Sequence, residues 1–347
     1  MKGIIIAGGL GTRLRPLTYQ RPKPLVPVAN RPFLEYQVAL LRKHGITDIV
    51  FATNYMAEQI EGHFGNGSRF GVKMQYAVEH EPLGTGGAIR NAAQLIPNSP
   101  VVVFNGDVLM DFDLREIVAF HQERHASATI TLTEVPSPNP FGVLYLTPSG
   151  EVERWEEPTE ELKKRLSLDR DIVPTGKDYI NAGCYILERS CIDRIPVDTK
   201  VSIERDTYPQ MIAARAGVYG YSAKGYWIDL GHAEQLLYAT QAVLSGAVHT
   251  AAAGMSVGEG TTIAPTTWIN GLTAIGKQCR IAGESRLENC IVMDNVTVGS
   301  NVRLYGIIVD ENVVIEDEVV ITGRGGGNSV PVIAAGSVLT RGTRLQL

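Results

Sequence analysis

The chain has 347 residues, 44% of them apolar and 20% charged, and a formal net charge of −5. Its length favours two domains, each large enough to bury a core of its own. The sequence contains no block of basic residues of the kind that binds nucleic acid, so we expect no nucleic-acid partner. No apolar run approaches the roughly 20 residues that cross a bilayer, so we expect a cytoplasmic protein without a membrane partner.

Neither the cysteines nor the histidines are spaced like metal ligands. The cysteines form no Cys-x-x-Cys pair, and we interpret all four as buried free thiols: Cys184, Cys191, Cys279 and Cys290. His121 and His125 stand four residues apart in a helical pattern, and we interpret them as a solvated helix face rather than a metal pair.

Up to about residue 136, short β-rich runs alternate with helical patterns. The predicted strands are Gly3 to Ala7, Ile49 to Thr53, Lys73 to Val78, Val101 to Phe104 and Ala128 to Thr133. A helix from Phe33 should stop at Gly45, and Asp113-x-x-Glu116 predicts a capping box for a helix through His121. This order predicts a mostly parallel, three-layer α/β sheet, in which ligands bind beyond the carboxyl ends of the strands.

After residue 250 an aliphatic residue recurs every six positions, which predicts a hexapeptide β-helix. The register slips twice, and the aliphatic positions are Val257, Ile263, Ile269, Ile275, Ile281, Leu287, Val292, Val298, Leu304, Val309, Ile315, Ile321, Ile333 and Leu339. We interpret Gly323 to Gly327 as a loop leaving one coil. The flat faces and exposed coil edges of such a domain favour pairing with another copy, so we expect a homo-oligomer.

The connection after the first strand has the features of a phosphate-binding loop. It reads Gly8-Gly9-Leu10-Gly11-Thr12-Arg13-Leu14-Arg15-Pro16-Leu17-Thr18, followed by Arg21-Pro22-Lys23-Pro24. Glycines let backbone N–H groups approach phosphate closely, and prolines stiffen a loop that presents Arg13 and Lys23. Position 14 is Leu, which excludes the dinucleotide fingerprint, and no Gly-Lys-Ser/Thr follows, which excludes a Walker loop.

This loop resembles the signature of the sugar-phosphate nucleotidyltransferase family, Gly-Gly-x-Gly-Thr-Arg-Leu-x-Pro-Leu-Thr followed by Pro-Lys-Pro. The resemblance covers roughly residues 1 to 245 and includes Glu81-Pro82-Leu83-Gly84-Thr85, Asn105-Gly106-Asp107, Asn181-Ala182-Gly183-Cys184-Tyr185, Val201-Ser202-Ile203-Glu204-Arg205 and Gly225-Tyr226-Trp227-Ile228-Asp229-Leu230-Gly231. It implies a Rossmann-like three-layer nucleotidyltransferase domain over residues 1–246, then a left-handed parallel β-helix over residues 247–347.

The implied reaction is Mg²⁺-dependent transfer of a nucleotidyl group from a nucleoside triphosphate to a sugar 1-phosphate, with release of pyrophosphate. Asp107 and Asp229 each end a short apolar run, and one or two carboxylates plus substrate phosphates suit Mg²⁺. Arg13 would neutralise the charge growing on the attacked phosphate and on pyrophosphate, and Lys23 would hold phosphate on the sugar side. The sugar phosphate is already an anionic nucleophile, so no general base is expected.

The resemblance also implies two groups of binding residues. The nucleotide would be held by Gly8, Gly9, Gly11, Thr12, Glu81, Pro82, Gly84 and Thr85, and the sugar by Gly142, Glu157 and Asn181. The family's usual Glu-Lys-Pro is here Glu157-Pro158, which lacks the phosphate-contacting lysine. Lys163, Lys164 or Lys177 could substitute, or Lys23 could suffice alone.

Three classes of function remain to be separated. An acyltransferase with hexapeptide repeats would need a histidine on the β-helix, and none follows His249. A catalytically silent sugar-nucleotide sensor should have lost part of the charged set, yet Arg13, Lys23 and both aspartates are present. Within the family the motifs look most like guanylyltransferases that use GTP and mannose 1-phosphate to make GDP-mannose, and thymidylyl-, uridylyl- and adenylyltransferases of glucose 1-phosphate stay open as alternatives.

Overall fold

The computed structural model describes residues 1–97, 99–168, 173–250, 254, 256–323 and 330–346. The chain divides into two compact units, each built from two segments. The first unit combines Met1–Gly9 with Leu41–Trp227, and the second combines Leu10–Leu40 with Ile228–Leu347. The boundary after residue 246 that we expect from the sequence stays a prediction.

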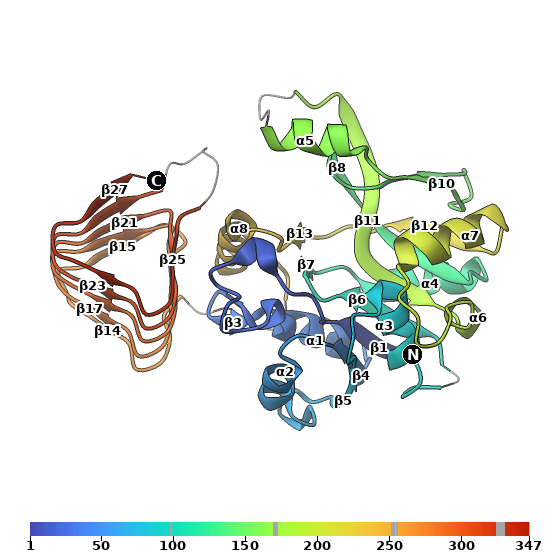
Figure 1. The fold of residues 1–347 in the computed structure, drawn as a ribbon, viewed down its shortest axis with the longest axis horizontal. Helices are drawn as coiled ribbons and strands as arrows, with labels where there is room; N and C mark the ends of the chain where they lie inside the picture. Colours follow the sequence, from blue (N-terminus) through green and yellow to red (C-terminus); the bar gives the residue numbers. More distant parts are fainter. Residues whose placement is uncertain (98, 169–172, 251–253, 255, 324–329, 347) are drawn as a thin grey trace. The chain divides into compact units, whose positions relative to one another are not determined.

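A nine-stranded mixed sheet forms the centre of the first unit (Figure 1). Its main path runs β10-β9-β11-β6-β1-β4-β5, and β8 joins it through β11 and carries β12. The strands are β1 (Lys2–Ile6), β4 (Asp48–Thr53), β5 (Lys73–Val78), β6 (Val101–Asn105), β8 (Ala128–Ser137), β9 (Val143–Leu146), β10 (Val152–Glu156), β11 (Gly176–Leu187) and β12 (Val218–Ser222). The four strands β1, β4, β5 and β6 are parallel, whereas β11 runs antiparallel to β6 and β8.

Helices cover both faces of this sheet, because successive side chains of a strand point to opposite faces. One face buries Ile4 of β1 together with Ile89 of α3 (Gly84–Ala92) and Met211 of α7 (Tyr208–Ala213). On the other face Phe51 of β4 contacts Phe64 of α2 (Ala57–Phe64), with ring centroids 5.0 Å apart. Further helices are α4 (Leu114–Glu123), α5 (Glu160–Leu168) and α6 (Arg189–Ile192). The predicted three-layer arrangement is confirmed.

The region of α4 corrects two sequence-based interpretations. Asp113 caps the helix and accepts a hydrogen bond from Arg115 N at 2.9 Å, but the Glu116 carboxylate accepts instead from the Tyr221 hydroxyl at 3.0 Å. His121 is not on a solvated face: it is 2% exposed, and its Nδ1 lies 2.8 Å from Thr129 Oγ1. The helix therefore packs its His121 side against β8.

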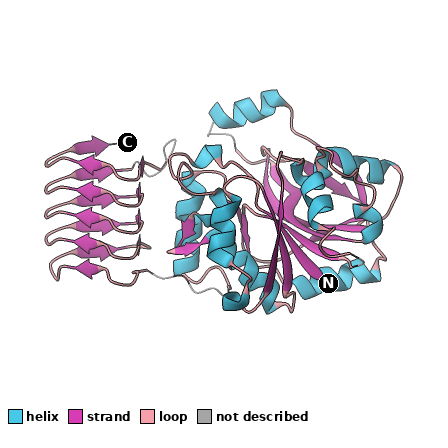
Figure 2. Cartoon of the chain, turned by 60° about the horizontal axis from the view of Figure 1, so that its bottom comes forward, coloured by secondary structure: helices cyan, strands magenta, loops and turns pink. Residues whose placement is uncertain are grey.

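The second unit contains a short hairpin, one helix and the β-helix. The hairpin pairs β2 (Pro27–Val28) with β3 (Arg31–Pro32), and α8 spans Ala233–Leu244. Helix α1 (Phe33–Lys43) starts in this unit and ends in the first. The β-helix stacks its coils in three parallel sheets, with the orders β14-β17-β20-β23-β26, β15-β18-β21-β24-β27 and β16-β19-β22-β25 (Figure 2).

The coil strands are two or three residues long. They are β14 (Thr262–Ile263), β15 (Trp268–Asn270), β16 (Ala274–Ile275), β17 (Arg280–Ile281), β18 (Arg286–Glu288), β19 (Ile291–Val292), β20 (Thr297–Val298), β21 (Arg303–Tyr305), β22 (Ile308–Val309), β23 (Val314–Ile315), β24 (Val320–Thr322), β25 (Val332–Ile333), β26 (Val338–Leu339) and β27 (Arg344–Gln346).

The six-residue period places one aliphatic residue of each strand inside the left-handed β-helix. Residues from Ile275 to Ile321 on this ladder are buried together, and Ile263, Ile269, Ile333 and Leu339 pack against them. Each register slip removes one residue from a coil. Thr262 pairs with Arg280 in the next coil, and Arg280 pairs with Thr297, so the second of these coils is one residue shorter than the first. Val257 differs from the expectation, because it is 43% exposed at the first coil. Most of the predicted loop at 323–327 lies outside the described residues.

All four cysteines are free and buried, as expected. Burial raises the pKa of Cys184 and Cys191 to about 12 and that of Cys290 to about 11. In the part of the chain that the structure describes, no helix is long and apolar enough to cross a membrane.

Candidate functional site

In the first unit, the ends of β1 and β6 bring a glycine pair and an aspartate to one edge of the sheet. The two strands are parallel neighbours, with Ile6 opposite Asn105, and Gly106 N donates to Ile6 O at 2.8 Å. Gly8 and Gly9 follow β1, and half-buried Asp107 follows β6. Both therefore lie at the carboxyl edge, where open α/β sheets bind ligands.

The turn from Glu81 to Thr85 joins β5 to α3 at the same edge of the sheet. Glu81 and Pro82 are exposed, whereas Gly84 begins the helix. The Thr85 hydroxyl donates to Glu204 Oε2 at 2.5 Å and accepts from Ile203 N at 3.0 Å. Thr85 thus fixes this turn against the segment around Glu204, and its hydroxyl is already engaged.

The three residues predicted to hold sugar lie on or directly beside the neighbouring strands β9, β10 and β11. Gly142 precedes β9 and Glu157 follows β10, and these strands pair with Val143 opposite Glu156. A Cβ atom on Gly142 would lie 2.7 Å from Glu157 Oε1, which also accepts from Trp155 Nε1 at 3.0 Å. Asn181 is adjacent to Ile180, which pairs with Val143. The structure therefore brings all three predicted residues together.

A partly buried hydrogen-bond network holds Asn181. Its Nδ2 donates to the Tyr185 hydroxyl at 2.6 Å, and that hydroxyl donates to Glu204 Oε1 at 3.2 Å. Asn181 Oδ1 accepts from Gly183 N at 2.9 Å. Burial, with a smaller contribution from Glu204, raises the pKa of Tyr185 well above its ordinary value, so the hydroxyl stays protonated.

Sequence reasoning assigned no role to Tyr185 or Glu204. Both stand in quoted motifs, Asn181-Ala182-Gly183-Cys184-Tyr185 and Val201-Ser202-Ile203-Glu204-Arg205, so the signal was present. Glu204 also accepts from Ser202 Oγ at 2.9 Å. One carboxylate therefore supports both the Thr85 turn and the Asn181 side chain.

In the second unit, the loop after Leu10 packs closely around Gly11. Gly11 is left-handed at φ 61°, and a Cβ there would lie 2.8 Å from Lys23 Cβ, so only glycine fits without displacement. The Thr18 hydroxyl donates to Gly11 O at 2.8 Å. Thr12 and Arg13 are exposed on a short 3-10 helix, Thr12–Leu14, whereas Lys23 is 7% exposed.

Arg13 and Asp229 lie beside the same backbone position. Asp229 ends β13 (Trp227–Asp229), and a Cβ atom on Gly231 would lie 2.9 Å from Asp229 Oδ2 and 3.0 Å from Arg13 Nη1. His232 follows directly: partial burial and the positive charges of Arg13 and Lys23 lower its pKa. Sequence reasoning missed His232, which only the fold brings near these cations.

The two predicted metal ligands are both half-buried carboxylates, Asp229 at the end of β13 and Asp107 in the turn after β6. Among the described residues, no group of three or more histidines, cysteines, aspartates or glutamates could hold a metal by itself. A hard cation such as Mg²⁺ usually takes one or two carboxylates plus substrate phosphates, so Asp107 and Asp229 fit it in donor type.

The lysines considered as replacements at Pro158 are distributed over β11 and α5. Lys177 Nζ pairs with Glu134 Oε2 at 2.7 Å, and Lys163 Nζ pairs with Glu160 Oε1 at 2.8 Å. Lys164 lies on the same helix as Lys163. Lys177 is four positions before Asn181 on β11.

Comparison with known proteins matches both parts of the chain. Residues 2–246 match the family described as Nucleotidyl transferase, and residues 242–325 match the GlmU-like C-terminal hexapeptide family. The chain is 36% identical to mannose-1-phosphate guanylyltransferase of Mycobacterium tuberculosis, over 85% of this chain and 80% of that protein. It is 33% identical to mannose-1-phosphate guanyltransferase of Kluyveromyces lactis, over 93% of this chain and 94% of that protein.

A solved structure is similar to about two thirds of the chain. It is HddC from Yersinia pseudotuberculosis complexed with GMP-PN, with 29% sequence identity and a TM-score of 0.57, covering 69% of this chain and 98% of that chain. The signature loop, the α/β sheet, the hexapeptide coils and the family matches agree. The chain therefore belongs to the nucleotidyl transferase family and is a sugar-phosphate nucleotidyltransferase with a C-terminal hexapeptide region.

Proposed function

We propose that the chain transfers a guanylyl group from GTP to mannose 1-phosphate, making GDP-mannose and releasing pyrophosphate. The structural observation that carries this proposal is the position of Arg13 and Asp229, whose guanidinium and carboxylate both border Gly231. A fixed cation beside a potential metal ligand suits a reaction in which charge moves between phosphates. The names of the relatives support guanine and mannose.

The proposed chemistry is an in-line displacement. A phosphate oxygen of mannose 1-phosphate attacks the α-phosphorus of GTP, and the bond from that phosphorus to the α,β-bridging oxygen breaks with its electron pair leaving on pyrophosphate. Arg13 stabilises the charge that grows on the α-phosphate and on pyrophosphate, and Lys23 holds phosphate on the sugar side. No proton transfer is needed, so positioning and electrostatics control the rate.

Asp107 and Asp229 are the residues that would hold Mg²⁺. When bound, the ion would offset negative charge on the triphosphate. Asp229 ends β13 and Asp107 lies in the turn two residues after β6, and both carboxylates are half-buried.

The binding residues divide by substrate. Backbone groups at Gly8, Gly9, Gly11 and Thr12, with the turn from Glu81 through Pro82 and Gly84 to Thr85, would contact the nucleotide. Gly142, Glu157 and Asn181 would contact the mannose hydroxyls, and their proximity at the ends of β9 and β10 and on β11 supports this role. Base selection would then depend on few hydrogen bonds.

We also propose that the chain works as a homo-oligomer assembled through its β-helix. Two of the three β-helix sheets expose side chains at their outward positions, both charged ones such as Arg280 and Arg286 and apolar ones such as Val314 and Val338. These flat faces and the exposed end coils are available for pairing with a second copy.

A pyrophosphate-release assay over four nucleoside triphosphates and several sugar 1-phosphates, with and without Mg²⁺, tests the proposal. The highest kcat/KM should belong to GTP with mannose 1-phosphate. Preference for dTTP, UTP or ATP with glucose 1-phosphate would replace the substrates but keep the reaction. No release from any pair, by a chain that still binds nucleotide, would favour the silent sensor.

A further inference from the structure

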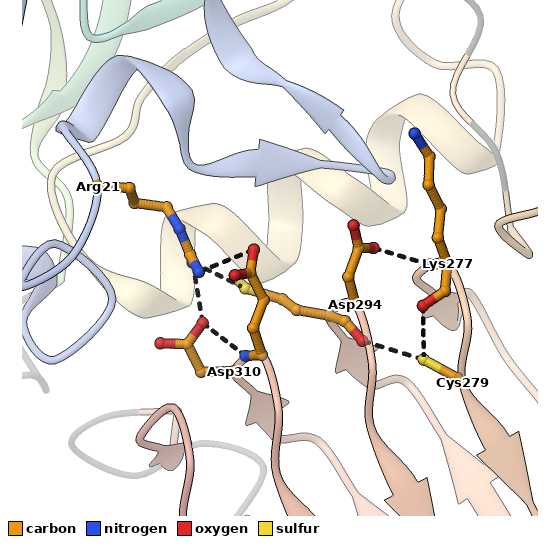
Figure 3. Close-up of polar contacts among 7 residues, drawn as sticks. Arg21, Lys277, Cys279, Asp294 and Asp310 are labelled. Carbon is orange, nitrogen blue, oxygen red and sulfur yellow. Dashed lines mark hydrogen bonds and ion pairs between the residues drawn. The ribbon is translucent and has the colours of Figure 1, made fainter. Parts of the chain in front are cut away.

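Two cations of the signature loop stand in different surroundings. Lys23 packs its stem against Gly11, whereas Arg21, two residues earlier, points toward the β-helix (Figure 3). Arg21 Nη1 lies 2.9 Å from Asp310 Oδ1, and Nη2 lies 2.9 Å from Glu311 Oε1. Nη1 also contacts Met293 Sδ at 3.1 Å. The charge of Arg21 is thus neutralised by carboxylates of the β-helix.

The β-helix side of this contact is fixed. Asp310 directly follows β22, its side chain is 3% exposed, and its Oδ1 also accepts from Glu311 N at 2.8 Å. The sheet that contains β22 has outward apolar residues, Ala274, Ile291 and Ile308, which are buried. A second contact from the same N-terminal segment reaches this sheet, because Asn30 Nδ2 donates to Ile275 O at 2.7 Å. Asp310 therefore stands on a covered, well-packed face.

The backbone between Arg21 and Lys23 is held in a turn, so a displacement of Arg21 can displace Lys23. Pro22 has φ −68°, the value that its ring imposes, and Leu25 N donates to Pro22 O at 2.9 Å. Val26 N donates to Lys23 O at 3.0 Å. With this turn held, a shift of Arg21 moves the Lys23 backbone.

We propose that Asp310 is a positioning residue for nucleotidyl transfer, which holds Arg21 and thereby places Lys23. This inference rests on the proposed role of Lys23. Asp310 touches no substrate; it keeps a buried guanidinium paired, and loss of its charge leaves that guanidinium partly uncompensated. The β-helix is then required for full turnover as well as for assembly.

The test compares full-length variants with GTP and mannose 1-phosphate. Asp310→Asn keeps the shape of the side chain and removes its charge. It should lower kcat about 10- to 100-fold, as expected for a small misplacement of a catalytic group, and change the KM for GTP less than threefold. Asp317→Asn is the matched control, because Asp317 caps a β-helix turn by accepting from Ser300 N at 2.8 Å and has no contact with Arg21 among the described residues. It should leave kcat unchanged.

A second set of variants separates positioning from stability. In a Lys23→Ala background, Asp310→Asn should cause no further loss of kcat, because both changes act on the same group. Arg21→Lys, which keeps the charge, should retain more activity than Arg21→Met. If Asp310→Asn lowers Tm but leaves kcat unchanged, or if its loss of kcat adds fully to that of Lys23→Ala, the positioning role is wrong. A wild-type chain that releases no pyrophosphate from this substrate pair would instead contradict the proposed substrates.

Discussion

The Nδ2 atom of Asn181 donates a 2.6 Å hydrogen bond to the Tyr185 hydroxyl. Because that hydroxyl donates in turn to Glu204 at 3.2 Å, the orientation of the Asn181 amide is set by a half-buried carboxylate. In the sugar-binding role that we propose for Asn181, an amide held in this way would contact a sugar hydroxyl without losing side-chain freedom on binding.

Tyr185→Phe removes the hydroxyl and keeps the ring. We expect the KM for mannose 1-phosphate to rise several-fold more than the KM for GTP, with a loss of about 1–2 kcal/mol in the free energy of unfolding. The matched control is Tyr208→Phe, because the buried Tyr208 hydroxyl has no hydrogen-bond partner in the described part of the chain. Steady-state kinetics and denaturant titration of both variants test whether the Tyr185 hydroxyl supports sugar binding. Equal changes in the KM values for mannose 1-phosphate and GTP would contradict this role.

Asp107→Ala and Asp229→Ala should each abolish turnover while leaving the fold intact. The reason is that Mg²⁺ would lose one of the two protein carboxylates that we propose as its ligands. Circular dichroism checks the fold, and pyrophosphate release over a Mg²⁺ titration checks the chemistry. Asp193→Ala serves as control, since Asp193 forms surface ion pairs with Arg90 and Arg189. Near-normal activity with Mg²⁺ in either test variant would refute the metal assignment.

Arg13→Ala should lower kcat by about 10²- to 10³-fold, the usual cost of removing one group that stabilises developing charge, while weakening GTP binding less. Arg15→Ala is the control from the same loop, since Arg15 is exposed and lies over the Tyr19 ring at 5.3 Å. Single-turnover rates and calorimetric GTP binding separate the two effects. A loss confined to binding would contradict the role.

The pKa of His232 in the Arg13→Ala variant tests whether Arg13 lies close to this histidine. Burial and then the charges of Arg13 and Lys23 lower the pKa of His232, so removing one charge should raise it. The folded state binds this proton less readily than the unfolded chain, so lowering the pH through the ordinary histidine range favours unfolding. In the Arg13→Ala variant, the free energy of unfolding should therefore depend less on pH in this range. An NMR titration of the imidazole in the two arginine variants measures the shift.

One of Lys163, Lys164 and Lys177 should contact the sugar phosphate when substrate is bound, because Pro158 stands where the family has lysine. Lys177 and Lys163 would each exchange a carboxylate partner for phosphate, a small change at an exposed ion pair. Alanine at the responsible position should raise the KM for mannose 1-phosphate. If alanine at all three positions leaves this KM unchanged, Lys23 anchors the phosphate alone.

Cutting the chain after Gly246 should yield a folded catalytic fragment of lower oligomeric state that still makes nucleotide sugar. The fragment lacks Asp310, so we expect a lower kcat and a lower Tm than in the full chain. Light scattering and the pyrophosphate assay measure both properties. An unchanged oligomer, or complete loss of chemistry in a folded fragment, would refute the assignment of chemistry to residues 1–246 and of assembly to residues 247–347.

Local sequence patterns predicted the fold in segments where the apolar residues repeat at one constant spacing or where a helix cap is present. The six-residue period placed Ile281 and Leu304 inside the β-helix, and the capping pattern located the start of α4 at Asp113. Strands β9 to β11 were not predicted. The register of β11 against β8 shifts between Asn181 and Tyr185, so no single alternation describes that strand.

Site residues were predictable when a motif holds them close in sequence and not when the fold alone joins them. Arg13 and Lys23 stand in one short loop, and their residue types indicate phosphate chemistry. Arg21 and Asp310 are 289 positions apart, so only their 2.9 Å contact identifies them as partners. His232 is ordinary in sequence and becomes notable only beside two cations.

The buried cysteines give this chain intrinsic reporters of local opening. Cys184 and Cys191 lie in the first unit, and Cys279 and Cys290 lie inside the β-helix, where their thiols donate to the carbonyls of Met293 and Glu288 at 3.1 Å. Only a thiolate reacts with alkylating reagents, and burial both excludes the reagent and raises the thiol pKa. The labelling rate of each cysteine therefore measures how often its surroundings open, and mass spectrometry of the labelled peptides separates unfolding of the sheet from unfolding of the coils.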